Sequence, residues 1–216
     1  MKHEANRKTL GGALHGALLI VALVGITTLV AGRAWSDDKK QPPTKEQQKE
    51  NEMMAKWAAA GTPGAFHKKL DVFVGDWKSV SKFWMAPGQE PQTSEGEMRM
   101  TWILGGRFLK QEYKGQAMGR PFEGMGLWGY DNLKKKYISS WVDTMSTKIA
   151  IELGTCDASG KTFTSFGSHD DPITGKVVKT KSITRVVNKD KHVLEMYAPG
   201  PDGKMFKNLE IVYTRK

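Results

Sequence analysis

The chain has 216 residues, of which 26% are charged and 39% hydrophobic, and its formal net charge is +10. This length and composition indicate a globular protein with a sizeable core and exclude a chain that is disordered throughout. The basic residues are scattered, and the densest run is only Lys134-Lys135-Lys136, so no nucleic-acid-binding surface is indicated. A single cysteine, Cys156, excludes an intrachain disulfide.

Residues 1–36 have the pattern of a targeting segment. A basic start is followed by a nearly continuous apolar run of about 17 residues, from Gly16 to Gly32. Ala34 and Ser36 are small residues that suit a cleavage site. We therefore expect an exported protein, periplasmic or secreted, with a cleaved signal peptide. The alternative is an uncleaved N-terminal anchor, which would be the protein's contact with a membrane.

Residues 37–66 are predicted to be a linker and a capping helix. Thr44 and Gln47 have the spacing of a capping box, which places a helix start after the linker prolines. The helix should run to about Ala60, where Gly61 and Pro63 end it. Its short apolar stripe predicts packing over one end of the domain, with partner or membrane binding as the alternative.

Residues 67–216 form the third predicted unit, in which the period of the pattern changes from 3.6 to 2. About ten strand-like runs follow one another, each ended by turn residues: 71–85, 95–103, 108–115, 122–130, 136–143, 148–154, 162–167, 176–187, 192–197 and 205–214. Short connections imply antiparallel neighbours, and closure hides the edges of such a sheet. We predict an all-β fold, an up-and-down antiparallel barrel of about ten strands with a short N-terminal helix.

Gly124 to Gly129 matches the G-x-G-x-x-G pattern of dinucleotide-binding proteins. That site needs a helix directly after the glycines, whereas a turn follows here, so we interpret them as points of close approach within a strand. The histidines lack metal-ligand spacing, and no nucleophile motif surrounds Cys156. We therefore predict no metal site and no cofactor, while a folded haem site stays open.

Seven tryptophans in a chain of this length suit an aromatic-lined pocket, and they suit a packed barrel core equally well. The leading hypothesis is a barrel that binds a small hydrophobic or amphiphilic molecule. The predicted lining residues are Trp102, Tyr113, Trp128, Trp141 and Glu210. Two alternatives remain at this point. One is a barrel enzyme with an interior carboxylate as general base, Glu210 or Glu112 paired with Arg107 or Arg99. The other is a structural or partner-binding envelope protein with a filled barrel.

Several short motifs in the last 150 residues or so are shared with one bacterial family. They are His67-Lys68-Lys69-Leu70, Gly75-Asp76-Trp77, residues 102–108, residues 119–124, Gly129-Tyr130-Asp131-Asn132, Trp141-Val142-Asp143, Asp171-Pro172 with Thr174-Gly175-Lys176, and residues 210–215. In this combination the chain resembles the bacterial domain-of-unknown-function family numbered 1579. The resemblance supports the fold and implies no established activity.

A second likeness is to lipocalin- or calycin-like barrels. These open with Gly-x-Trp and set a late arginine against that tryptophan. The resemblance implies that Gly75, Trp77 and Arg215 form a structural closure with a cation–π contact. The haem-binding branch of such barrels uses a late histidine, for which His192 is the nearest candidate.

Overall fold

The structure is a computed structural model, and it describes residues 42–172 and 174–216. The predicted leader, residues 1–36, and the linker through residue 41 lie outside the described residues. The chain divides into residues 1–42 and 43–216, and every described element belongs to the second unit. Among the described helices, none combines the length and the apolar character needed to cross a bilayer.

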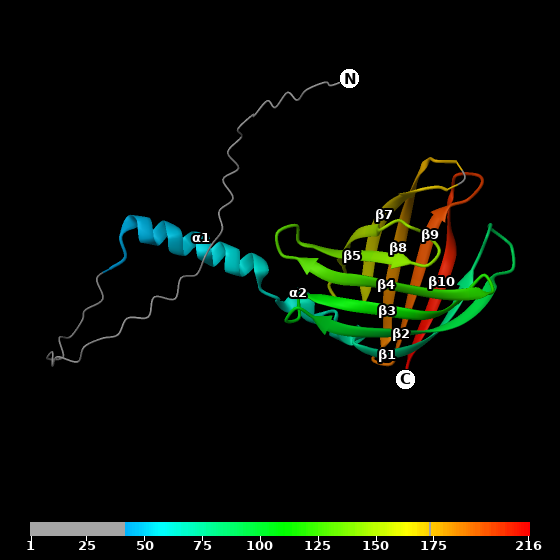
Figure 1. Cartoon of the computed structure of the whole chain (residues 1–216), viewed down its shortest axis with the longest axis horizontal. Helices are drawn as coiled ribbons and strands as arrows, with labels where there is room; N and C mark the ends of the chain where they lie inside the picture. Colours follow the sequence, from blue (N-terminus) through cyan, green and yellow to red (C-terminus); the bar gives the residue numbers. More distant parts are fainter. Residues whose placement is uncertain (1–41, 173) are drawn as a thin grey trace, which may run out of the picture. The chain divides into compact units, whose positions relative to one another are not determined.

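The described part contains two α-helices, one 3-10 helix and ten strands (Figure 1). In chain order they are α1 (Lys45–Gly61), α2 (Ala65–Lys68), η1 (Asp71–Phe73), β1 (Gly75–Phe83), β2 (Gln92–Ile103), β3 (Phe108–Ala117), β4 (Arg120–Asp131), β5 (Lys136–Asp143), β6 (Ala150–Cys156), β7 (Thr162–Asp170), β8 (Val177–Asn188), β9 (Lys191–Pro199) and β10 (Met205–Arg215).

The strands form a closed up-and-down barrel. Each strand pairs antiparallel with its sequence neighbours, and β1 pairs antiparallel with β10 to complete the ring. In Figure 1 the teal β1 and the red β10 lie side by side although they stand at opposite ends of the barrel sequence. The seam has a regular register, with Trp77 opposite Arg215 and Phe83 opposite Leu209. The predicted fold class is confirmed.

Helix α1 starts with the predicted capping box. The backbone amide of Gln47 donates to the Thr44 hydroxyl at 3.2 Å, and the Thr44 amide donates to the Gln47 side chain at 2.8 Å. The helix buries none of its residues, and Trp57 is 72% exposed. The predicted packing of its apolar stripe against the barrel is therefore not seen. The helix is tied at its end by Asn132, whose side-chain amide donates to the carbonyl of Thr62 at 2.8 Å.

The first predicted strand begins too early. Residues 71–73 form η1, and β1 starts only at Gly75. The 3-10 turn places Leu70 and Phe73 three residues apart on one side, and both side chains are fully buried. The Phe73 carbonyl also accepts a hydrogen bond from the Trp77 indole at 2.8 Å. Tertiary packing therefore overrides the strand-like apolar run at this point.

Burial along β1 identifies the inner face of the barrel. Trp77, Ser79 and Ser81 are buried, and the residues between them are exposed. Residues that are paired across neighbouring strands face the same side of the sheet. Met98, the partner of Trp77, and Tyr113, the partner of Met98, therefore also face inward.

The two ends of the barrel differ. We call the end that carries α2, η1 and the β2–β3 turn the closed end, because Leu70 and Phe73 fill it. The opposite end, where β1 ends at Phe83 and β5 ends at Asp143, is called the open end.

Candidate functional site

The closed end of the interior is packed with aromatic rings. Phe73 lies 4.9 Å from Trp128 and 5.4 Å from Phe163, centroid to centroid, and Phe163 lies 5.0 Å from Tyr137. The exposed fractions of Phe73, Phe163 and Tyr137 are 0–4%. This half of the barrel is a packed aromatic core.

The predicted closure residues meet at this end. The Arg215 guanidinium lies over the Trp77 ring, 4.1 Å from its centroid, and donates to the carbonyls of Val74 at 2.8 Å and Val72 at 3.0 Å. A Cβ at Gly75 would lie 2.5 Å from Arg215 Nη1, and Gly75 has a φ of +129°. Gly75 therefore provides both the backbone conformation and the space for the arginine.

His192 belongs to the same core. It is 3% exposed, stacks on Tyr213 at 4.5 Å and meets the Trp77 ring edge-on at 4.3 Å. Burial, reinforced by the Arg215 charge, lowers the pKa of His192 to about 3, so the imidazole is neutral. Aromatic rings of Phe73, Trp77 and Tyr213 surround this side chain at the closed end. Within residues 42–172 and 174–216, no group of three or more potential metal ligands is found.

The inward-facing residues nearer the open end are only partly buried. Phe83, Phe122, Trp141 and Met196 fall in the intermediate range of exposure, although their strand positions face the interior. In a closed barrel, this exposure means that solvent reaches the interior from the open end. The candidate site is this partly exposed half of the interior.

A carboxylate faces inward in this half. Glu152 lies in β6, opposite Ser139 of β5 and Gly167 of β7. Its Oε2 accepts a hydrogen bond from the Ser165 hydroxyl at 2.8 Å, and its Oε1 accepts one from Ser182, also at 2.8 Å. Gly167 leaves the space for this side chain, since a Cβ there would lie 3.0 Å from Glu152 Cγ.

The neighbouring strands β4 and β5 are aromatic on their inner face, and two glycines position the largest ring there. A Cβ on Gly124 would come closer than 3.0 Å to the Trp141 ring, and one on Gly126 would clash with the Ser140 carbonyl. The Trp141 ring thus lies across bare backbone, and its indole N–H donates to Asp143 Oδ2 at 3.1 Å. These are glycines of the G-x-G-x-x-G match. They lie inside β4 with no helix after them, as the sequence predicted.

The five predicted lining residues lie in different parts of the barrel. Trp141 and Tyr113 face the interior, and the Tyr113 hydroxyl accepts a hydrogen bond from Ser79 at 3.0 Å. Trp128 belongs to the packed aromatic core. Trp102 also faces inward but lies at the closed end, where its indole donates to Asp71 at 2.8 Å.

Glu210 was placed on the wrong face by the prediction. Its register partner Lys82 is exposed on the outer face of β1, and its carboxylate forms an ion pair with Lys207. Lys207 also lies 3.4 Å from Glu195, which contacts Arg185 at 3.4 Å. Glu210 therefore belongs to an ionic network outside the barrel.

The carboxylate–arginine pairs of the enzyme hypothesis are not assembled in the interior either: Arg99 and Glu112 are register partners of β2 and β3, but on the outer face. Glu112 is bound to Lys110 at 2.7 Å, and Arg99 to Asp76 at 2.7 Å. Arg107 donates to the Leu104 carbonyl in a turn at 3.1 Å. The acids that face inward are instead Glu152 in β6 and Asp143 at the end of β5.

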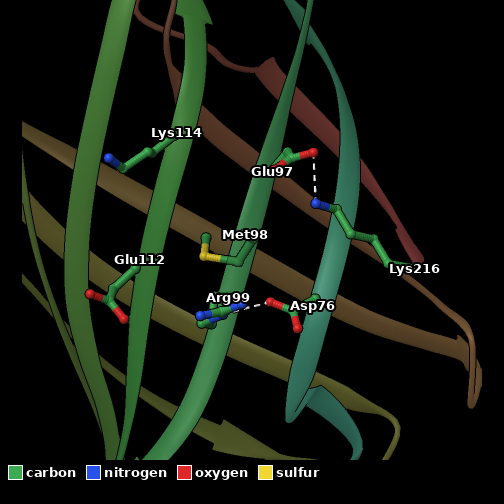
Figure 2. A pocket seen from close by; sticks show the side chains of 7 residues that line it. All are labelled: Asp76, Glu97, Met98, Arg99, Glu112, Lys114 and Lys216. Atoms are coloured by element: carbon green, nitrogen blue, oxygen red, sulfur yellow. Dashed lines mark hydrogen bonds and ion pairs between the residues drawn. The ribbon is translucent and has the colours of Figure 1, made fainter.

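A groove of about 250 Å³ lies on the outer face of β1–β3 (Figure 2). Its lining residues are Asp76, Glu97, Met98, Arg99, Glu112, Lys114 and Lys216. Figure 2 shows two of its ion pairs, Arg99 with Asp76 and Lys216 with Glu97, the latter at 2.6 Å. Each charged side chain of the lining has a partner of opposite charge, in the groove or, for Glu112 and Lys114, beside it, so the groove offers a ligand little uncompensated charge.

The fold and its partly exposed interior define the class, which is that of small, closed, up-and-down β-barrel proteins. Within this class, the chain belongs to the family described as "Protein of unknown function (DUF1579)", whose model matches residues 62–215. The family resemblance found in the sequence is confirmed. No curated protein matches the chain.

Solved structures with a similar fold include Rv2717c from M. tuberculosis. It is 15% identical, with a TM-score of 0.53 over 72% of this chain and 99% of that chain. At this identity the likeness shows the fold alone. A de novo designed fluorescence-activating β-barrel is 14% identical with a TM-score of 0.39, over 68% of this chain and 95% of that chain. EF1p2_mFAP2b bound to DFHBI is 13% identical with a TM-score of 0.37, over 70% of this chain and 100% of that chain.

Proposed function

We propose that the protein binds one small amphiphilic molecule in the open half of the barrel interior. The observation that carries this proposal is the exposure of inward-facing aromatic side chains, Trp141 and Phe122 among them, beside a packed closed end. Burial of an apolar body against these rings would supply the affinity. Polar groups on the neighbouring strands would orient the ligand.

The two halves of the interior would have separate tasks. The closed half, with Trp77 and Arg215 at its seam, holds the ring of strands together whether or not a ligand is present. The open half can then keep apolar surface exposed without loss of the fold.

We also propose that the barrel acts outside the cytoplasm, in the periplasm or as a secreted protein. The support is the basic start and the apolar run of residues 1–36. Intact-mass measurement of the protein recovered from its own host tests this. A mature chain that starts near Asp37 supports export with cleavage, and full-length chain in the cytosolic fraction contradicts it.

A titration with the neutral fluorescent probe N-phenyl-1-naphthylamine tests ligand binding. The probe should bind with saturation, and Trp141→Ala should weaken binding by roughly tenfold, as expected for loss of a central aromatic contact. Trp84→Ala is the matched control, because the Trp84 ring lies outside the barrel. The Lys207 ammonium nitrogen lies over that ring, 5.5 Å from its centroid. Absence of saturable binding, or equal losses in both variants, would overturn the proposal.

A further inference from the structure

We infer that the ligand of the open half is an amphiphile that carries a positively charged ammonium group, held by Glu152. This inference rests on the proposed function and specifies the chemical class of its ligand. Its basis is the position of Glu152 on the inner face and the hydrogen bonds that hold the carboxylate there.

The carboxylate is held in place without being saturated. Each oxygen accepts one serine hydroxyl, from Ser165 or from Ser182, at 2.8 Å. A carboxylate has about four lone-pair sites, so each oxygen keeps one for a further donor. Ser182 is 4% exposed, so this anchoring contact lies deep in the interior. The serines thereby orient the carboxylate while it stays able to accept a ligand donor.

No cation of the described residues neutralises this acid. Within residues 42–172 and 174–216, no lysine, arginine or histidine nitrogen lies within 4.0 Å of Glu152. Arg215 faces inward at the closed end, where backbone carbonyls hold it, and Arg120 is exposed at the open-end terminus of β4. A partly desolvated carboxylate without a cation gains most from a ligand that brings one.

Acids on the outer face differ in this respect. Glu195 is only 16% exposed at its side chain, yet it contacts both Lys207 and Arg185. Glu97 pairs with Lys216. The acids of the outer face are thus neutralised by lysine or arginine side chains of the protein, whereas Glu152 on the inner face would be neutralised by the ligand.

The aromatic wall suits the same ligand class. Indole and phenyl faces attract cations, and Trp141 and Phe122 supply such rings in the open half. A second inward-facing carboxylate, Asp143, lies at the end of β5 and accepts from the Trp141 indole. Two acids along the path from the open end would attract cations into the interior and disfavour anions.

Three probes with the same naphthalene body test the inference: 1-naphthylmethylamine, 1-naphthylmethanol and 1-naphthylacetate. Calorimetric titration at pH 7 should show the amine binding about tenfold more tightly than the alcohol, since one charge-assisted hydrogen bond separates them. The acetate should bind most weakly. Glu152→Gln should bring the amine to the affinity of the alcohol and leave the alcohol unchanged. Glu97→Gln removes the same charge from the outer face and should change none of these affinities.

Equal affinities of amine and alcohol in the native protein would overturn the inference, as would an amine preference that survives Glu152→Gln. In both cases saturable binding of N-phenyl-1-naphthylamine would leave the proposed function intact. Loss of all binding, neutral probes included, would overturn the proposed function itself and the inference with it. The comparison of amine and alcohol in the native protein decides the matter even if Glu152→Gln fails to fold.

Discussion

The guanidinium of Arg215, at the end of the last strand, lies 4.1 Å from the centroid of the Trp77 ring in the first strand. The two residues are direct register partners across the seam that closes the barrel. The same arginine also holds the carbonyls of Val72 and Val74, just before β1. One side chain therefore connects the end of the barrel to its beginning, so this pair should matter for stability rather than for ligand binding.

Trp77→Ala should lower the free energy of unfolding by about 3–5 kcal/mol, because it leaves a large cavity in a fully buried position. Arg215→Lys should cost about 1–3 kcal/mol, because an ammonium group cannot make the forked contacts of a guanidinium. Urea unfolding followed by far-UV circular dichroism measures both. Lys216→Ala, beside the seam but in an exposed ion pair, is the control and should change little. A stable Trp77→Ala protein that had lost its ligand would instead place Trp77 in the binding site.

The glycines of β4 should be sensitive to the smallest side chain. Gly126→Ala should lower the free energy of unfolding by about 1–3 kcal/mol, since its methyl group would overlap the Ser140 carbonyl, which cannot rotate away. Gly61→Ala is the matched control. A Cβ added at Gly61 would meet no atom within 4 Å, and alanine is a good helix former, so stability should stay the same or rise. If Gly126→Ala were as stable as Gly61→Ala, Gly126 would not be required for the approach of β5.

Local patterns made much of this fold predictable. The Thr44–Gln47 spacing located the start of α1, and the period-2 runs separated by glycine and asparagine turns located the strands. Gly75, Trp77 and Arg215 were assigned to the closure because the lipocalin-type resemblance brought two distant motifs together, and the structure joins them. Such features depend on residues that are neighbours in sequence or on a shared motif, so they are visible before folding.

The inner face could not be predicted from local pattern. In β6 the apolar residues Ile151 and Leu153 are on the outer face, 49% and 43% exposed, while Glu152 faces inward. Polarity alone would place the two apolar side chains inside the barrel and the glutamate outside. In β10 a bulge between Lys207 and Leu209 shifts the register, and Glu210 falls on the outside. The facing of each strand is decided by closure of the whole ring, which involves residues far apart in sequence.

The tie between Asn132 and α1 gives a local prediction. The Asn132 amide lies within 3.2 Å of the carbonyls of Ala59, Ala60 and Thr62, which are left without helical partners. Asn132→Ala should speed amide hydrogen exchange in residues 53–62 by roughly 2- to 10-fold, the effect of one lost hydrogen bond. Unfolding of the barrel should be unaffected. Asn132→Asp keeps the size but removes the donor, and it should behave like alanine. Unchanged exchange in both variants would show that α1 does not depend on this contact.

The buried His192 makes stability depend on pH in a defined direction. Its pKa is about 3 in the folded protein and near 6.5 when unfolded, so between these values the unfolded chain binds a proton that the folded chain does not. The stability that the neutral His192 contributes is therefore fully present above about pH 6.5, and it is lost progressively as the pH falls toward 3. Between pH 7 and pH 5 this one group should account for a loss of about 2 kcal/mol.

His192→Phe should remove this loss. Phenylalanine keeps a flat ring between Tyr213 and Trp77 and also eliminates the imidazole Nδ1, which has no hydrogen-bond partner within the described residues. Urea unfolding at pH 7 and at pH 5 gives the difference for each protein, and the contribution of other groups cancels between native and variant. His169→Gln is the control, because His169 lies near the end of β7 and is far less buried. If the variant lost as much stability as the native protein on acidification, His192 would have to accept a proton without unfolding, and the packed closed end described above would have to open to admit water.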